Sequence, residues 1–230
     1  YRTENYRILS GHSYGGLLVA QSFYKKPHLF QAHFAHSPSL FWNNSQVPNA
    51  LIDFIQANPT HKNFLYMNMG NEGNPESESP EGLKMLQGVQ SIETVLKKIS
   101  PDNLDFKFEY FDQEPHQTTQ IYGALGALRG LYPKWSVPYK TSLAGFDAFT
   151  AHFDYLTKRY GYTIEPKSWQ IYDEGVAQLE FLNNPEEAIR YFKYNLERDP
   201  SLFEERKFII DALTRLGQTE DAKSHLAVLL

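Results

Sequence analysis

The chain carries, at residues 6–17, the sequence YRILSGHSYGGL, and the rest of the sequence is interpreted outward from it. Its centre, residues 11–15, matches G-x-S-x-G, the pattern of a serine on a sharp turn between a strand and a helix. Residues 6–9 are typical of a short buried strand, and residues 17–25 have apolar spacing without proline, which predicts a helix. We therefore expect Ser13 on a strained, accessible turn, with a helix N-terminus that favours developing negative charge.

Small residues around Ser13 are a physical requirement of such a turn. Gly11 and Gly15 would let the strand and the helix pass close to each other, and Gly16 would extend this freedom. The same pattern occurs by chance in ordinary glycine-rich turns, so the flanking strand and helix are what favour a nucleophile here. An acid and then a histidine must follow in the chain.

Three more strand-like runs follow, each ending in a loop or a helix, at residues 32–36, 64–69 and 106–111. Two helix-length segments, 48–57 and 81–99, separate them. Strands that alternate with helices predict a parallel sheet with helices on its faces. Reactive groups in open sheets of this kind gather beyond the carboxyl ends of the strands. Ser13, Glu72 and His116 all stand at such ends.

Four short pieces of the chain carry a family resemblance: SGHSYGG at residues 10–16, SPSLFWN at 37–43, GNE at 70–72 and PH at 115–116. In them the chain resembles the esterase family of α/β-hydrolases that includes esterase D (S-formylglutathione hydrolase) and the enterochelin and salmochelin esterases of siderophore metabolism. The resemblance covers residues 1–132. It implies an α/β-hydrolase fold, of which this chain holds the C-terminal part of the sheet. It also implies the roles of three side chains: Ser13 as nucleophile, His116 as general base and Glu72 as orienting acid.

The chemistry explains why these residue types are needed together. A neutral serine hydroxyl is a poor nucleophile, so His116 must take its proton during attack and return it to the leaving alcohol. A carboxylate on the other imidazole nitrogen fixes the tautomer. Asp112 and Glu114 compete with Glu72 for this role, because they lie close to His116 in sequence. Glu72 is favoured because the acid should follow the strand before that of the histidine.

The oxyanion of the tetrahedral intermediate needs backbone N–H donors, and Tyr14, the residue after the nucleophile, supplies one of them. The second donor normally lies on a loop much earlier in the fold. The chain begins without methionine, a few residues before the nucleophile strand. By resemblance, the first strands lie upstream, so we expect a C-terminal piece of a longer protein, with weak or no activity if those strands are absent. Trp42 and Asn43 would lie near the pocket mouth by resemblance; alone, they are an ordinary loop aromatic and a turn former.

The other histidines are interpreted as structural or solvated. His12 is expected to pack or hydrogen-bond locally, and His33 and His36 to lie in the core or at a strand end. The rest show no partner pattern: His28, His61, His152 and His225.

The end of the chain has a different character. Residues 133–139 contain two prolines and indicate a linker, which we place at 133–145, followed by an all-α region at 146–230. Helices are expected at 145–160, 166–182, 185–197, 202–216 and 219–229. Ala188, Phe192 and Pro200 match part of the tetratricopeptide pattern, and Ala222 and Leu226 recur one 34-residue period later. Tyr172 and Leu179 fill large positions of the earlier helix, whereas Val176 stands where a small residue is expected. A plain array of amphipathic helical hairpins has the same spacing.

The tail is expected to play an accessory role, because at least three repeats are usually needed for a stable binding surface. Its helices could cap the pocket, extend the subunit or form a homodimer contact.

Composition narrows the classes of function. The 230 residues carry a net charge of −5 and no basic run, which argues against nucleic acid or an anionic membrane as partner. No apolar stretch is long enough to span a membrane. The absence of cysteine excludes disulfides, thiolate metal sites and a cysteine nucleophile, but does not separate cytoplasm from periplasm. No metal or cofactor is predicted, because the sequence has no HExxH, Walker or dinucleotide motif.

The sequence as a whole predicts a serine hydrolase that cleaves a small-molecule ester through an acyl-enzyme on Ser13. The ester could be a small carboxylic ester, a thioester or a siderophore lactone. Two alternatives stay open. One is a catalytically silent hydrolase fold that binds partners through its helical tail, and the other is a peptidase that uses the same residues.

Overall fold

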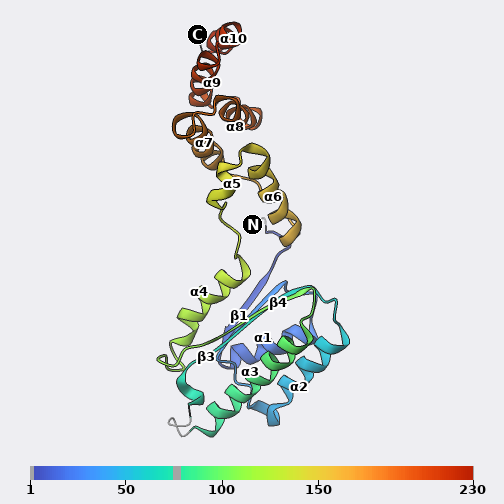
Figure 1. Cartoon of the computed structure of the whole chain (residues 1–230). Helices are drawn as coiled ribbons and strands as arrows, with labels where there is room; N and C mark the ends of the chain where they lie inside the picture. The colour runs from blue at the N-terminus through green and yellow to red at the C-terminus, as the bar shows by residue number, and fades with distance from the viewer. Residues whose placement is uncertain (1–2, 75–78, 230) are drawn as a thin grey trace. The chain divides into compact units, whose positions relative to one another are not determined.

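The computed structural model of the chain describes residues 3–74 and 79–229 (Figure 1). The chain divides into two compact units, Tyr1–Pro133 and Lys134–Leu230, and each is described by itself.

The first unit is built on a parallel sheet. Its described residues form four strands in the order β1-β2-β3-β4, namely β1 (Ile8–His12), β2 (Ala32–His36), β3 (Asn63–Met69) and β4 (Leu104–Tyr110). Each strand pairs in parallel with the next, for example His12 with His36 and His36 with Asn68. All residues of β2 and β3 are buried, because helices cover both faces of the sheet.

Three helices cover one face and a fourth covers the other (Figure 1). The first three are α1 (Tyr14–Lys25), α2 (Trp42–Ala57) and α3 (Pro80–Ile99). They pack on alternate strand residues such as Leu65, Met67 and Met69 to form the main apolar core. The fourth helix, α4 (Thr119–Leu131), lies on the opposite face, where its glycines approach His36, Tyr66 and Asn68.

The predicted strands and helices are present, with shifted ends. Residues 32–36 form a strand with the predicted bounds, whereas β1 begins two residues later than expected and continues through Gly11 and His12. These two residues still pair with Ala35 and His36, so the strand runs directly into the turn at Ser13. Helix α2 begins at Trp42 rather than at residue 48, but left-handed backbone at residues 43–45 interrupts it, so the regular part starts close to the predicted position.

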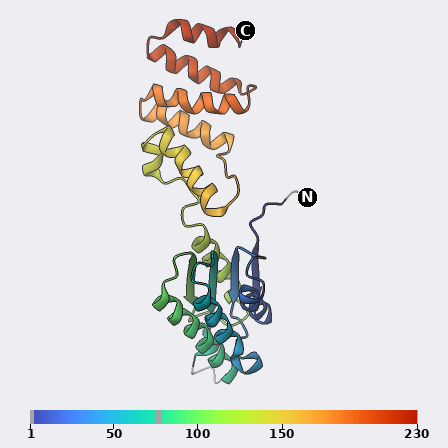
Figure 2. The same cartoon turned by 90° about the vertical axis from the view of Figure 1, so that its right-hand side faces the viewer.

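The second unit is entirely helical in its described residues, and its helices stack in sequence order (Figure 2). The helices are α5 (Tyr139–Leu143), α6 (Phe146–Tyr160), α7 (Ser168–Val176), the π-helical turn η3 (Ala177–Phe181), α8 (Pro185–Arg198), α9 (Phe203–Arg215) and α10 (Thr219–Ala227). The segment expected as a linker, 133–145, therefore contains a helix, α5. The single helix expected at 166–182 ends as an α-helix at Val176 and widens into the π-helical turn.

Packing in this unit follows only part of the repeat pattern. Ala188, Phe192 and Ala222 are buried in one apolar cluster with Leu179, whereas Leu226 is 44% exposed. The tetratricopeptide-like assignment stays a prediction. No helix among the described residues has the length and apolar character that crossing a membrane would require.

Candidate active site

Ser13 lies on the turn between β1 and α1, in a backbone conformation that is unfavourable for a residue with a side chain. Its φ of 59° and ψ of −117° are held in place from three sides. The Ser13 N–H donates to the His36 carbonyl at 3.0 Å, and the Ser13 carbonyl accepts from the N–H groups of Leu17 and Ser39 at 3.0 and 3.1 Å. The strain therefore rests on well-ordered neighbours, as a nucleophile elbow requires.

The three glycines around Ser13 differ in how much space a side chain would have at each position. A Cβ on Gly11 would lie 2.4 Å from the Gly15 carbonyl oxygen, and one on Gly16 would lie 2.9 Å from the Cα of Pro38. A Cβ on Gly15 itself would meet nothing within 4 Å. The close approach of strand and helix thus requires glycine at positions 11 and 16, while Gly15 contributes its backbone to that approach.

Replacing Gly11 by Ala should destabilise the protein by about 1–3 kcal/mol, because the added methyl group overlaps rigid backbone. Gly15→Ala is the matched control: it sits at the start of α1 in open space, and alanine favours helix there. Urea unfolding measures both variants. Equal stability of the Gly11→Ala variant and the parent would contradict the close approach described here.

His116 and Glu72 come together although 44 residues separate them. His116 Nδ1 lies 3.1 Å from Glu72 Oε1. Glu72 stands in the short 3₁₀ turn η1 (Asn71–Gly73) after β3, and His116 stands in the loop between β4 and α4. The two loops are joined by the Asn71 N–H, which donates to the Glu114 carbonyl at 2.8 Å. Gly70 makes this possible, because a Cβ there would lie 2.4 Å from the same carbonyl oxygen.

The geometry also distinguishes Glu72 from the two alternative acids. The Glu114 carboxylate accepts a hydrogen bond from the Thr118 hydroxyl at 2.7 Å. Among the described side chains, neither Asp112 nor Glu114 forms a hydrogen bond with the His116 ring. When the Glu72 carboxylate accepts a hydrogen bond from the Nδ1–H of His116, Nε2 keeps the lone pair that a general base needs.

The Ser13 hydroxyl hydrogen-bonds to Ser39 in this structure. Ser13 Oγ lies 3.3 Å from Ser39 Oγ, and between the described Ser13 and His116 side chains there is no hydrogen bond. His116 is nevertheless next to the elbow, because its ring lies 4.5 Å, centroid to centroid, from that of His12. Catalytic hydrogen bonds are often long without substrate and tighten when it binds. The structure therefore holds the His116 ring against His12, the residue before Ser13, without a direct bond between Ser13 and His116.

The remaining predicted residues are Tyr14, Trp42 and Asn43. Tyr14 is the first residue of α1, so its N–H has no partner within the helix and can serve as an oxyanion donor. The exposed rings of Tyr14 and Trp42 meet edge to face at 5.7 Å, and Phe41 packs on Tyr14 at 6.3 Å. Asn43 has left-handed backbone and bonds through its amide to Gln46. Trp42 thus belongs to an aromatic surface next to the elbow, whereas Asn43 acts as a turn former.

The sequence did not predict a network of hydrogen-bonded polar side chains next to the candidate site. Four of its members are buried, namely His36, Ser37, Asn68 and Thr119, and the exposed Ser10 joins the network through His36. The Asn68 amide donates to the Thr119 carbonyl, so its oxygen accepts from His36 Nδ1 at 2.9 Å. His36 Nε2 then accepts from the Ser10 hydroxyl. Burial lowers the pKa of His36, which favours the neutral imidazole, although the bond to Asn68 opposes this shift. The sequence signal that could have indicated this network is the presence of polar residues at the ends of otherwise apolar strands.

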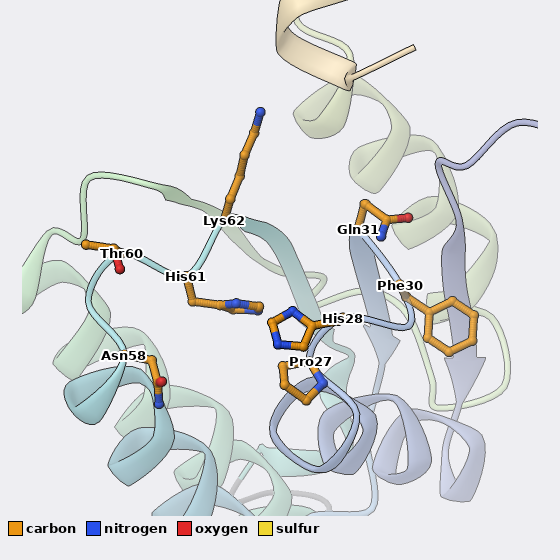
Figure 3. Close-up of a pocket in the computed structure, with 8 residues that line it drawn as sticks. All are labelled: Pro27, His28, Phe30, Gln31, Asn58, Thr60, His61 and Lys62. Carbon is orange, nitrogen blue, oxygen red and sulfur yellow. The ribbon is translucent and has the colours of Figure 1, made fainter.

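A separate cavity of about 470 Å³ opens at the other end of the sheet (Figure 3). Its lining comes from the loops that precede β2 and β3, and His28 and His61 face each other across it with ring centroids 6.0 Å apart. Ser13, Glu72 and His116 follow the opposite ends of the strands, so this cavity is not part of the candidate site. Within the described residues, no cluster of three or more histidine or acidic side chains could hold a metal ion.

The chain is similar to curated proteins and to solved structures. No family model matches the chain. A siderophore enterobactin esterase of Emericella nidulans is 46% identical over 47 residues, and a siderophore triacetylfusarinine C esterase of Aspergillus fumigatus is 47% identical over 48 residues. Over these short segments the chain is similar to siderophore esterases. These matches cover 20% and 21% of this chain, and the chain spans 16% of the length of each relative.

The fold has a counterpart among solved structures. An IroE-like serine hydrolase from Shewanella oneidensis superposes with a TM-score of 0.67 at 19% identity, covering 85% of this chain and 60% of that chain. This likeness confirms the predicted fold, an α/β-hydrolase-type parallel sheet followed by a helical region. The resemblance to the enterochelin-esterase-like hydrolases is confirmed as well.

Proposed function

We propose that the protein is a serine esterase that cleaves small-molecule esters, siderophore esters among them, through an acyl-enzyme on Ser13. The observation that carries the proposal is the His116–Glu72 pair at 3.1 Å beside a strained serine elbow. The three residues follow one another in the chain in the order serine, acid, histidine that this class of fold uses, and each stands after the end of a strand. The names of the relatives add the substrate class, since both are siderophore esterases.

The proposed reaction has two halves. In the first, His116 Nε2 takes the proton of the Ser13 hydroxyl as Oγ attacks the ester carbonyl carbon, and the alkoxide of the tetrahedral intermediate accepts the Tyr14 N–H. His116 then protonates the leaving alcohol, and the C–O bond breaks to leave Ser13 acylated. In the second half, His116 activates a water that releases the acid and restores the hydroxyl. Glu72 stabilises the imidazolium in both halves.

The aromatic surface of Tyr14, Phe41 and Trp42 supports an ester with apolar or aromatic groups. Tyr14 and Trp42 are 57% and 53% exposed, although aromatic rings of this size usually bury most of their area. They flank the nucleophile and so can contact a substrate group next to the reacting carbonyl. The same surface does not distinguish an ester from a peptide, so the peptidase alternative requires a direct test.

The test measures which bonds the full-length protein cleaves, by comparing ester substrates with an amide that carries the same acyl group as the simple ester. We expect hydrolysis of a siderophore trilactone, with and without bound ferric iron, and of a simple aryl ester, but not of the matching amide. Product analysis by mass spectrometry identifies the bonds cleaved. Cleavage of the amide at a comparable rate would favour a peptidase, and no turnover of any compound would favour the silent binding protein.

A further inference from the structure

The backbone carbonyl of His116 accepts two side-chain hydrogen bonds. His12 Nε2 lies 2.7 Å from this oxygen and the Thr119 hydroxyl lies 3.1 Å from it. A carbonyl can only accept, so His12 Nε2 carries the proton and donates. This contact joins residues 104 positions apart, although the sequence predicted only a local role for His12.

His12 directly precedes Ser13 in the chain, so this bond ties the elbow to the base. The His12 and His116 rings also lie against each other, with centroids 4.5 Å apart and planes inclined by 44°. The imidazole of His12 thus spans the gap between the backbone of the nucleophile turn and the backbone of the base loop. Neither His12 nitrogen is needed for proton transfer to substrate in the proposed reaction.

Thr119 forms the second half of the support. Its side chain is fully buried, its hydroxyl accepts from Ser37 at 3.0 Å while donating to His116, and its own carbonyl accepts from the Asn68 amide. Gly123, one turn along α4, leaves room for the His36 side chain, because a Cβ at position 123 would lie 2.5 Å from His36 Nδ1. The base loop is therefore fixed to β2 and β3 through Thr119 and to β1 through His12.

We propose that His12 is a positioning residue: its Nε2–H holds the His116 carbonyl and thereby sets the distance between the general base and the serine that follows it. The inference rests on the proposed function. A displacement of about 1 Å between reacting groups can cost about 100-fold in rate. Ser13 and His116 share no hydrogen bond in this structure, so the bond from His12 to the His116 carbonyl is a direct link between the nucleophile turn and the base loop.

The test is a pair of substitutions in the full-length protein, His12→Leu and His12→Gln. Leucine removes the donor, whereas glutamine places an N–H at about the reach of Nε2. We expect His12→Leu to lower kcat for ester hydrolysis by about 10- to 100-fold with KM little changed, and His12→Gln to recover most of the loss. Thermal unfolding of each variant is measured alongside, since a merely structural role would lower stability without a split between kcat and KM.

A second pair keeps the proposal testable if His12→Leu does not fold. Thr119→Val removes the other donor to the same carbonyl, and Thr119→Ser retains it; we expect a lower kcat in the first and recovery in the second. Parent-like kcat in His12→Leu, or equal losses in His12→Leu and His12→Gln, would overturn the positioning role of His12. These outcomes presuppose an active parent, whereas an inactive parent that no fluorophosphonate labels would refute the proposed function instead.

Discussion

Replacing Ser13 by Ala should abolish ester hydrolysis and labelling by a fluorophosphonate probe while leaving the fold intact. Loss of a serine nucleophile removes the covalent path altogether, and rates in comparable enzymes fall by roughly 10⁴-fold or more. The substitution should not reduce stability, because it removes one hydroxyl whose partner, Ser39, keeps a backbone bond to the same turn. Serine already holds the positive φ at position 13 with a Cβ present, so alanine adds no new backbone clash.

The measurement is in-gel labelling of full-length protein, with Ser22→Ala as the matched control. Ser22 lies in α1, the helix that begins directly after Ser13, and takes no part in the site. The control should label like the parent. Labelling that survives in Ser13→Ala would mean that another serine reacts, and the nucleophile assignment would then be wrong.

The sequence predicted the elbow well because its determinants are local. A strand, a turn with small residues and a helix follow one another within residues 8–25, so pattern and spacing are sufficient. The alternation of strands and helices also predicted a parallel sheet, which the structure has, whereas the order β1-β2-β3-β4 was not among the predictions. The ends of the elements were predicted less well. Strand β1 continues through Gly11 because it pairs with β2 there, and local propensity does not show this pairing.

Contacts between distant loops could be inferred only when chemistry demanded them. The pairing of Glu72 with His116 was expected because a general base needs an orienting acid, and the topology limited where that acid could stand. The bond between His12 and the His116 carbonyl was not expected, because no reaction step requires it and nothing local marks it. The Ser39 contact was missed for the same reason: SPS in a loop gives no sign that its last hydroxyl faces the nucleophile.

The helical unit illustrates a different limit. Its helices were evident from apolar spacing, but α5 was not, because five residues after two prolines carry too little periodicity to stand out from a linker. The π-helical turn η3 likewise depends on packing around Leu179 and not on any residue that breaks a helix. A repeat pattern specifies which positions carry large or small side chains, but not whether they are buried. Phe192 is buried, whereas Leu226, which stands one 34-residue period later, is exposed.

Glu72 and His116 should differ in how strongly their loss affects the rate. His116→Ala removes the group that moves protons in the proposed reaction and should lower kcat/KM about as far as Ser13→Ala does, since the residues of such a triad act as a unit. Glu72→Gln keeps the size of the side chain and one oxygen, so His116 can remain in place while the imidazolium loses its counter-charge. We expect a smaller loss, roughly 10²- to 10⁴-fold.

The rate of ester hydrolysis at saturating substrate gives kcat for each variant, and the rate at limiting substrate gives kcat/KM. His28→Ala, at the cavity on the opposite end of the sheet, is the matched control for His116→Ala and should behave like the parent. Asp112→Asn and Glu114→Gln test the alternative acids, and neither should approach the loss in Glu72→Gln, because neither carboxylate bonds to the His116 ring among the described contacts. Parent-like rates for Glu72→Gln, with a large loss in one of these two, would transfer the acid role to that residue and imply that the base loop rearranges when substrate binds.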